Sequence, residues 1–225
     1  MAITRVQYKQ IYPASSGQFD SNQTGGNLIL IIAQGYSYNG TPSSLTCTST
    51  IGDTPSQFTK ALGPTFGAGL VGWYVWNCTG GVTTYSIAGL PDDSSITLYE
   101  YSGADSSSDP LIDADNITNS SANPLGVTLN TEAGGALMFF WGDEVNLSYS
   151  SMNTGATQIF FDTTRYAAAA ENLNTSAGTT VVNATVSSDI DNMIIAASFR
   201  IPGGAGGSKS ITGIQSITGI QSITF

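Results

Sequence analysis

Short apolar runs alternate with clusters of Gly, Pro, Asn, Asp and Ser along most of the chain. Runs of this kind, bounded by turn-forming residues and rich in β-branched and aromatic side chains, are typical of β-strands. The predicted strands cover residues 3–8, 27–33, 45–50, 70–77, 82–87, 95–101, 126–130, 136–141, 157–161, 179–186 and 193–201. The pattern therefore predicts an all-β protein.

Two of these runs predict central strands, because they are apolar on both faces. They are NLILIIA at residues 27–33 and ALMFFW at residues 136–141, and a glycine pair precedes each of them. Glycine lets the chain turn tightly into the strand that follows. The run 193–201 instead alternates with a period of two and places Ser198 and Arg200 on its second face. This alternation predicts a sheet that is packed on one side.

One segment, residues 166–173, favours a helix through its four consecutive alanines. It is short and lacks a clear cap, so an extended strand or a loop competes with the helix. The whole pattern predicts an antiparallel two-sheet β-sandwich of jelly-roll type over residues 1–202. One such domain fits a chain of 225 residues.

The end of the chain follows a different pattern. Residues 203–209 are rich in glycine and predict a flexible linker. Residues 210–225 form an imperfect six-residue repeat, SITGIQSITGIQSITF, in which isoleucine recurs every third residue. This spacing fits neither a one-sided strand nor a helix, whereas a polyproline II-like conformation would align all the isoleucines along one edge.

A tail of this length cannot bury an apolar stripe by itself, so we expect it to assemble with a partner surface. That surface belongs to its own sandwich or to another chain. One arrangement is a trimer, in which three chains each contribute six-residue repeats around a common axis. A tail that folds back on its own domain or stays disordered is the simpler alternative. The residues predicted to carry assembly are Ile211, Ile214, Ile217, Ile220, Ile223 and Phe225.

Composition argues against several classes of function. The chain has no histidine, which rules out a Ser-His-Asp triad, a Cys-His dyad and a His-ligated metal site. Its net charge is −10, and its 6 basic residues are scattered, whereas binding to nucleic acid needs clustered Lys and Arg. Membrane insertion is not expected, since no segment reaches the roughly 20 apolar residues of a spanning helix. We therefore expect a non-enzymatic protein with no cofactor, no metal and no nucleic-acid partner.

The redox state and the compartment stay open. Residues 1–10 contain basic residues but no apolar region of a signal peptide. This is compatible with a protein made without export and with one whose leader has been removed. If the protein works outside the cell, Cys47 and Cys78 are candidates for a disulfide, and two partly buried free thiols are the equal alternative.

The acidic clusters are weak candidates for chemistry. Four clusters supply oxygen ligands of the kind that calcium takes, but without a calcium-loop spacing: Asp92-Asp93, Asp113 with Asp115, Asp143-Glu144, and Asp189 with Asp191. Solvated turns at strand ends are the simpler interpretation. A glycosidase pair of carboxylates, such as Glu100 and Asp143, is not selected by any motif.

Aromatic residues are the other candidates for binding. Tyr36 and Tyr38 lie in a loop rich in Gly, Asn and Ser and are the plausible contacts with a host-surface glycan. Trp73 alternates with Val71 and Val75, so it is expected in the core instead.

The order of the motifs resembles a widespread bacterial and phage β-sandwich module. The segments that carry the resemblance are TRVQ, GGNLILIIAQ, the polar segment SLTCTSTIGDTPSQFTKA, LVGWYVWNCTGGVTTYSI, LYEYSGADSSSDPLID, VTLNTEAGGALMFFWGDE and MIIAASFRIP, within roughly residues 3–202. Members of this group are usually domains of secreted surface proteins or of virion structural proteins, and the resemblance implies no catalytic residues. It implies a structural role for Glu100-Tyr101-Ser102-Gly103, with Glu100 accepting hydrogen bonds from a neighbouring loop and Ser102-Gly103 ending a strand. The cysteine pair and the isoleucine repeat depart from the pattern.

The leading expectation is a structural protein of a bacteriophage virion. It would be a capsid decoration or cement protein, or a head or tail fibre subunit, that self-associates as a homo-oligomer and docks on capsid or other virion proteins. Virion subunits fold in the host cytoplasm, so no export signal is needed, and an acidic exterior keeps the particle soluble. The alternative is a secreted surface adhesin, a carbohydrate-binding module or an extracellular filament subunit.

Overall fold

The computed structural model describes residues 2–35, 45–62, 69–119, 125–142, 149–152, 156–162, 167–186 and 192–203. Within these ranges the chain folds into antiparallel β-strands. The first eight are β1 (Thr4–Ile11), β2 (Ser16–Gly17), β3 (Leu28–Gly35), β4 (Thr46–Ser49), β5 (Ser56–Leu62), β6 (Gly69–Val75), β7 (Tyr85–Ala88) and β8 (Ser95–Ser102). The next eight are β9 (Leu111–Asn119), β10 (Leu125–Thr131), β11 (Ala136–Gly142), β12 (Tyr149–Met152), β13 (Thr157–Asp162), β14 (Ala167–Asn172), β15 (Gly178–Val186) and β16 (Asn192–Phe199). A helix able to cross a membrane does not occur in the described ranges.

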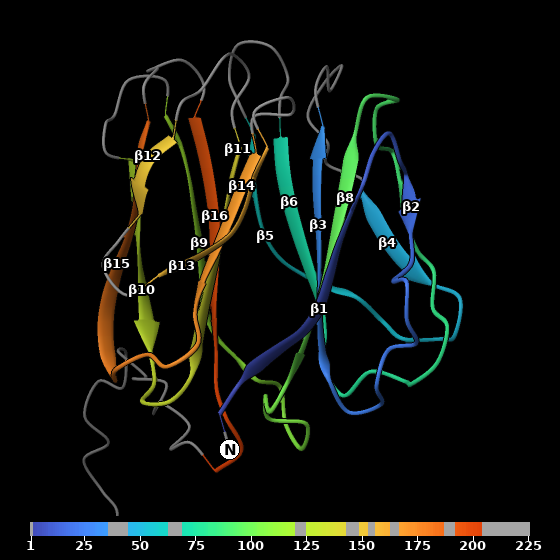
Figure 1. Cartoon of the computed structure of the whole chain (residues 1–225), viewed down its shortest axis with the longest axis horizontal. Coiled ribbons are helices and arrows are strands. Elements are labelled where there is room, and N and C mark those ends of the chain that lie inside the picture. Colours follow the sequence, from blue (N-terminus) through green and yellow to red (C-terminus); the bar gives the residue numbers. More distant parts are fainter. Residues whose placement is uncertain are drawn as a thin grey trace, which may run out of the picture.

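The strands form four sheets that are stacked as layers (Figure 1). The layers have the strand orders β2-β7-β4, β1-β8-β3-β6-β5, β13-β14-β11-β16-β9 and β10-β15-β12. An apolar core fills the space between each pair of neighbouring layers. The predicted all-β sandwich is confirmed, and the structure adds a second sandwich that packs on the first through the two five-stranded sheets.

The second sandwich repeats the topology of the first. Adding eight to each strand number converts the sheets β1-β8-β3-β6-β5 and β2-β7-β4 into β9-β16-β11-β14-β13 and β10-β15-β12. The two repeats face each other as in an approximate two-fold dimer. The Tyr8 ring of β1 stacks on Phe160 of β13 at 6.4 Å, and Asn116 of β9 donates to Thr59 Oγ1 of β5 at 2.8 Å. The edge strand β1 of the first sheet therefore lies against the edge strand β13 of the second, and β5 lies against β9.

The turn before each central strand shows the same repetition at atomic detail. In the first repeat the Gly26 amide donates to the Cys78 carbonyl at 2.9 Å, and the Cys78 amide donates to Asn27 at 3.1 Å. In the second repeat Gly134 and Thr175 make the same bond at 2.9 Å, and Thr175 returns one to Gly135 at 3.1 Å. Gly26 and Gly134 have φ angles of 89° and 75°, which are readily accessible only to glycine. The glycine pairs seen in the sequence thus form equivalent turns. Gly26, the second residue of its pair, corresponds to Gly134, which is the first residue of the other pair.

Four β-bulges mark the edges of the two five-stranded sheets. Each is a register shift in an edge strand. The shifts occur between Arg5 and Gln7 in β1, Gln57 and Thr59 in β5, Leu111 and Asp113 in β9, and Gln158 and Phe160 in β13. The shifts in β1 and β9 lie at equivalent positions, as do those in β5 and β13. Because bulges bend and twist an edge, they oppose the addition of a further strand.

The central layers are buried on both sides, which corrects one prediction. Met193, Ile195, Ala197 and Phe199 of β16 face the core between the two sandwiches, as their alternation predicted. The other face of β16 was predicted to be partly solvated, but the second three-stranded sheet covers it. Ile194 and Ala196 pack in that outer core, and Ser198 is fully buried, with its hydroxyl donating to the Asn130 carbonyl at 2.6 Å.

The alanine-rich segment is a strand and not a helix. β14 lies between β11 and β13 in the sheet. Ala169 faces the core between the sandwiches, while Ala168 and Ala170 face the outer core. Pairing with two neighbouring strands therefore outweighs the intrinsic helix propensity of alanine. The prediction for Trp73 is confirmed, since it is 2% exposed and packs with Val71 and Val75.

Buried polar groups join the layers. Arg5 Nη1 of β1 lies 3.1 Å from Glu171 Oε1 of β14, and the Tyr101 hydroxyl of β8 donates to Glu171 Oε2 at 2.8 Å. These contacts connect the two sandwiches, because β1 and β8 belong to the first and β14 to the second. The two repeats are therefore joined by polar contacts as well as by an apolar core.

Candidate functional site

The residues predicted to bind or to assemble lie mostly outside the described ranges. This holds for Tyr36 and Tyr38 and for the repeat at residues 210–225, so the roles predicted for them stay predictions. Cys47 and Cys78 are described, and both are free thiols that contact the core between β4 and β6. Burial raises the pKa of each thiol to about 12.

The acidic candidates have structural surroundings where they are described. Asp113 and Asp115 lie within the edge strand β9 and not in a turn, and Asp113 Oδ2 accepts from the Asn130 amide at 2.9 Å. Glu100 is fully buried in β8, whereas its suggested partner Asp143 lies outside the described ranges. Among the described residues, His, Cys, Asp and Glu form no group of three that could hold a metal ion.

Glu100 plays the structural part that the resemblance implies. Its Oε1 accepts from the Thr24 amide at 2.7 Å and from the Asn27 side-chain amide at 2.6 Å. Its Oε2 accepts from the Gln7 side-chain amide. The carboxylate therefore fixes the turn before β3 and the edge strand β1. Ser198 takes the equivalent place in β16, since Glu100 pairs with Ile29 and Ser198 with Leu137 in the corresponding strands.

A second polar network holds one end of the first sandwich. The Tyr85 hydroxyl donates to Gln23 Oε1 at 3.0 Å. The Gln23 side-chain amide donates to Asp53 Oδ2 at 3.2 Å and to the Thr79 carbonyl, and Asp53 Oδ1 accepts from the Thr79 amide at 3.0 Å. Burial and then the Asp53 carboxylate raise the pKa of Tyr85. The network ties together the segments before β3, β5 and β7.

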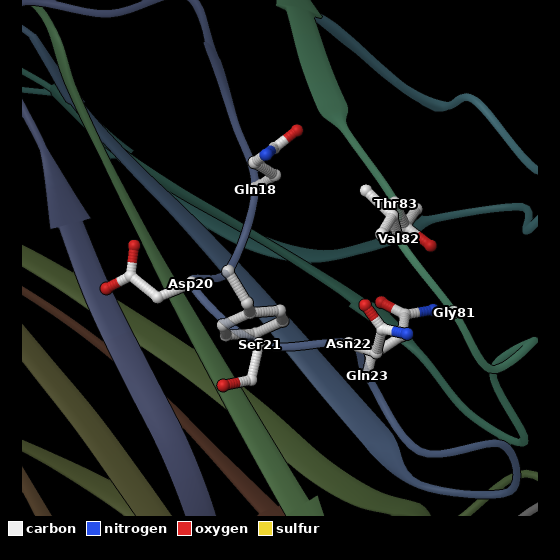
Figure 2. Close-up of a pocket in the computed structure, with 9 residues that line it drawn as sticks. Gln18, Asp20, Ser21, Asn22, Gln23, Gly81, Val82 and Thr83 are labelled. Carbon is white, nitrogen blue, oxygen red and sulfur yellow. The ribbon is translucent and has the colours of Figure 1, made fainter.

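A small pocket lies beside this network (Figure 2). Its cavity volume is about 60 Å³. Two segments form it, and Gln23 and Gly81 hold them side by side through two backbone hydrogen bonds of 3.0 and 2.9 Å. The lining residues are Gln18, Phe19, Asp20, Ser21, Asn22, Gln23, Gly81, Val82 and Thr83. This pocket is the candidate functional site of the described residues.

The polar groups beside the pocket are engaged in hydrogen bonds with the surrounding loops. Cys78 precedes Thr79 of the network, and its thiol donates to the Thr24 carbonyl at 3.2 Å. With its pKa raised to about 12, Cys78 stays protonated at neutral pH, and the thiol form is a poor nucleophile. The Gln23 side chain is engaged on both its oxygen and its nitrogen. The polar groups therefore order the loops that shape the pocket.

The sequence did not predict this site. Gln23 lies 30 residues from Asp53 and 62 residues from Tyr85, so no local motif joins them. The glycines around them, at residues 25–26 and 80–81, were the only local signal of the turns that bring them together. No family model, curated protein or solved structure matches the chain significantly.

Proposed function

We propose that the chain is a non-enzymatic structural protein of a bacteriophage virion. It acts as a capsid decoration or cement protein, or as a head or tail fibre subunit. The observation that best supports this proposal is the stack of two sandwiches with a continuous core between them. In such a stack the two five-stranded layers are buried on both faces, which suits a scaffold more than a module that opens and closes around a substrate.

The placement of the carboxylates also supports a scaffold. Glu100 fixes a turn, Glu171 joins the two sandwiches, and Asp53 orders a loop end. Asp105 orders its own turn, because its carboxylate accepts from the Ser107 amide at 2.9 Å and from the Ser107 and Ser108 hydroxyls at 2.6 Å. Each of these groups stabilises the fold through hydrogen bonds or an ion pair.

Self-association is proposed to use the C-terminal repeat. The bulged edges of the five-stranded sheets oppose open-ended pairing of strands between copies. The isoleucine repeat at residues 210–225 then supplies the apolar surface for assembly, with other copies of the chain and with the particle as partners.

The experiment that tests the virion assignment is quantitative mass spectrometry of purified particles. Particles are isolated from the phage or prophage that encodes the chain and are purified on a density gradient. We expect the chain to co-purify with the particle proteins at many copies per particle. Its presence only in the culture supernatant or on the cell surface would contradict the proposal and favour the adhesin alternative.

A further inference from the structure

Exposed apolar side chains gather along the edge strand β1. Val6 is 49% exposed, Tyr8 is 45% exposed, and Tyr12, which directly follows the strand, is 42% exposed. They are three of the five large apolar side chains that are exposed in the part of the chain that the structure describes. We call these three residues the β1 patch. Their concentration on one short segment marks it as an interaction surface.

The patch is anchored on both sandwiches through Tyr8. The Tyr8 ring stacks on Tyr99 of β8 at 6.2 Å and on Phe160 of β13 at 6.4 Å, and the Arg5 guanidinium lies 5.5 Å from the centre of the same ring. Three neighbours therefore hold Tyr8 in place while nearly half of its surface stays exposed. An aromatic side chain that is already ordered loses little conformational entropy when a partner covers it.

The surroundings of the patch favour an uncharged partner. Arg5 lies 3.1 Å from Glu171, and Lys9 is paired with Asp20 at 2.5 Å, so both basic side chains of β1 already have acidic partners. A charged partner would lose hydration on binding without gaining a new ion pair. The C-terminal repeat fits this requirement, because residues 210–225 contain no charged side chain and carry isoleucine at every third position.

The described chain ends at the side of the molecule where β1 begins (Figure 1). The Asp105 amide donates to the Arg200 carbonyl at 3.1 Å, and Gly103 packs so closely on the Ala2 carbonyl that a Cβ atom would have no room. The turn that contains Gly103 and Asp105 thus lies beside both ends of the described chain. Residues 203–210 can span at most about 25 Å, so the repeat can reach a β1 patch.

The length of one six-residue unit matches the length of the patch. From Val6 to Tyr12 an extended chain covers about 20 Å, at roughly 3.4 Å per residue. One unit of the repeat covers about 19 Å at roughly 3.1 Å per residue, and all of residues 210–225 cover about 50 Å. One patch therefore has room for one unit only, which leaves the other units available to patches on other copies.

We propose that the β1 patch is the docking surface of the C-terminal repeat, with one six-residue unit on each patch and successive units on different copies of the chain. This inference rests on the proposed function in one respect, since it names the surface that the repeat uses in self-association. One tail then joins several copies, and the multiple contacts strengthen one another. The contact is made by side chains, because the bulge between Arg5 and Gln7 opposes the addition of a strand to β1.

The test uses the full chain with every isoleucine of the repeat replaced by serine. This variant keeps the β1 patch but cannot fill it with its own tail. It is labelled with ¹⁵N and titrated with a synthetic peptide of residues 210–225, and the amide chemical shifts are followed. We expect the peptide to shift the amides of Val6, Tyr8 and Tyr12, whereas a peptide with serine in place of each isoleucine should shift none of them.

Substitutions in the patch show whether its side chains make the contact. Tyr8→Ser should weaken peptide binding by about tenfold or more, as the loss of an aromatic side chain at the centre of an interface does. Val6→Ser is a second patch variant that keeps the stacking on Phe160, and it should weaken binding as well. Val181→Ser makes the same change at an exposed position of β15 and should leave binding unchanged. Circular dichroism verifies that each variant is folded.

Light scattering with the chain in excess over the peptide measures the bridging. We expect complexes with two or more chains per peptide. The proposal would be overturned by complexes with one chain per peptide, by the absence of peptide binding, or by equal affinity for the patch variants and Val181→Ser. None of these outcomes decides the virion assignment, which depends on the protein content of purified particles.

Discussion

Glu100 shows how a single buried carboxylate can order a turn and a sheet edge. It is fully buried, and its acceptor oxygens are bonded to Thr24, Asn27 and Gln7. All three partners are amide donors, so a side chain at this position must accept. The second repeat uses the smaller Ser198, which donates to the Asn130 carbonyl instead.

Glu100→Gln is therefore expected to destabilise the protein. The new NH₂ group would face amide donors, which leaves buried groups unsatisfied and costs about 1–3 kcal/mol. Urea unfolding measures the change in free energy. Asp93→Asn, in an exposed turn, makes a similar exchange and should change the stability little. Equal stabilities for the two variants would show that the bonds to Glu100 do not hold the turn.

Asp105 gives a prediction for acid pH. Hydrogen bonds from the Ser107 and Ser108 side chains and from the Ser107 amide lower the pKa of Asp105 to about 2. The unfolded value is about 3.9, so the folded state favours the charged form. The resulting stability is present above about pH 4 and is lost as the pH falls towards 2.

Asp105→Asn should accordingly be less stable than the unchanged chain at pH 6, and the difference should shrink between pH 4 and pH 2. Urea unfolding at several pH values measures this convergence. A constant difference across the range would mean that the charge of Asp105 plays no part.

At the scale of strands, the bulge in β5 depends on the absence of a side chain in β6. A Cβ atom on Gly72 would lie 2.1 Å from Cζ of Phe58, the bulged residue. The equivalent position in the second repeat is Ala169, next to the bulged Ile159. The smaller side chain at that bulge leaves room for the alanine methyl group.

Gly72→Ala is expected to destabilise the protein by about 1–3 kcal/mol, the usual cost of overpacking. In a Phe58→Ile background, which copies the second repeat, the same change should cost clearly less. A double-mutant cycle from thermal or urea unfolding measures the coupling. Additive effects would show that Gly72 is needed for a reason other than the Phe58 ring.

Strands with long apolar runs were predictable, and some strands that lack such a run were missed. β3 and β11 were predicted because a strand buried on both faces reads as a continuous apolar run. β9 was missed because an edge strand tolerates carboxylates such as Asp113 and Asp115, and the sequence LIDADNITN reads as a loop. β14 was ambiguous because alanine favours a helix locally, while its pairing partners lie far away in the sequence.

At the scale of the whole molecule, the repeat of the sandwich was hidden in the sequence. Equivalent positions hold different residues, such as Glu100 and Ser198, or Cys78 and Thr175. The turns and bulges of the backbone recur in both repeats, but the side chains at equivalent positions differ. The second face of β16 could not be assigned for the same reason, because its cover is a sheet that only the tertiary fold reveals.

The pocket likewise depends on tertiary structure. Thr83 and Gln23 are ordinary residues in the sequence, and they meet only because the segments before β3 and β7 pair through Gly81. The candidates that the sequence singled out, Tyr36 and Tyr38, lie outside the described ranges.

The central claim is that the C-terminal repeat assembles copies of the stacked sandwiches. Multi-angle light scattering tests it on the full chain and on a variant with Ser in place of Ile211, Ile214, Ile217, Ile220 and Ile223. A control with Ala in place of Ser210, Ser216 and Ser222 keeps the apolar stripe, and circular dichroism verifies the β-structure of all three. We expect the full chain and the control to have a mass that is a multiple of 23.3 kDa, and the isoleucine variant to have the mass of a monomer. One common mass for all three proteins would contradict the claim.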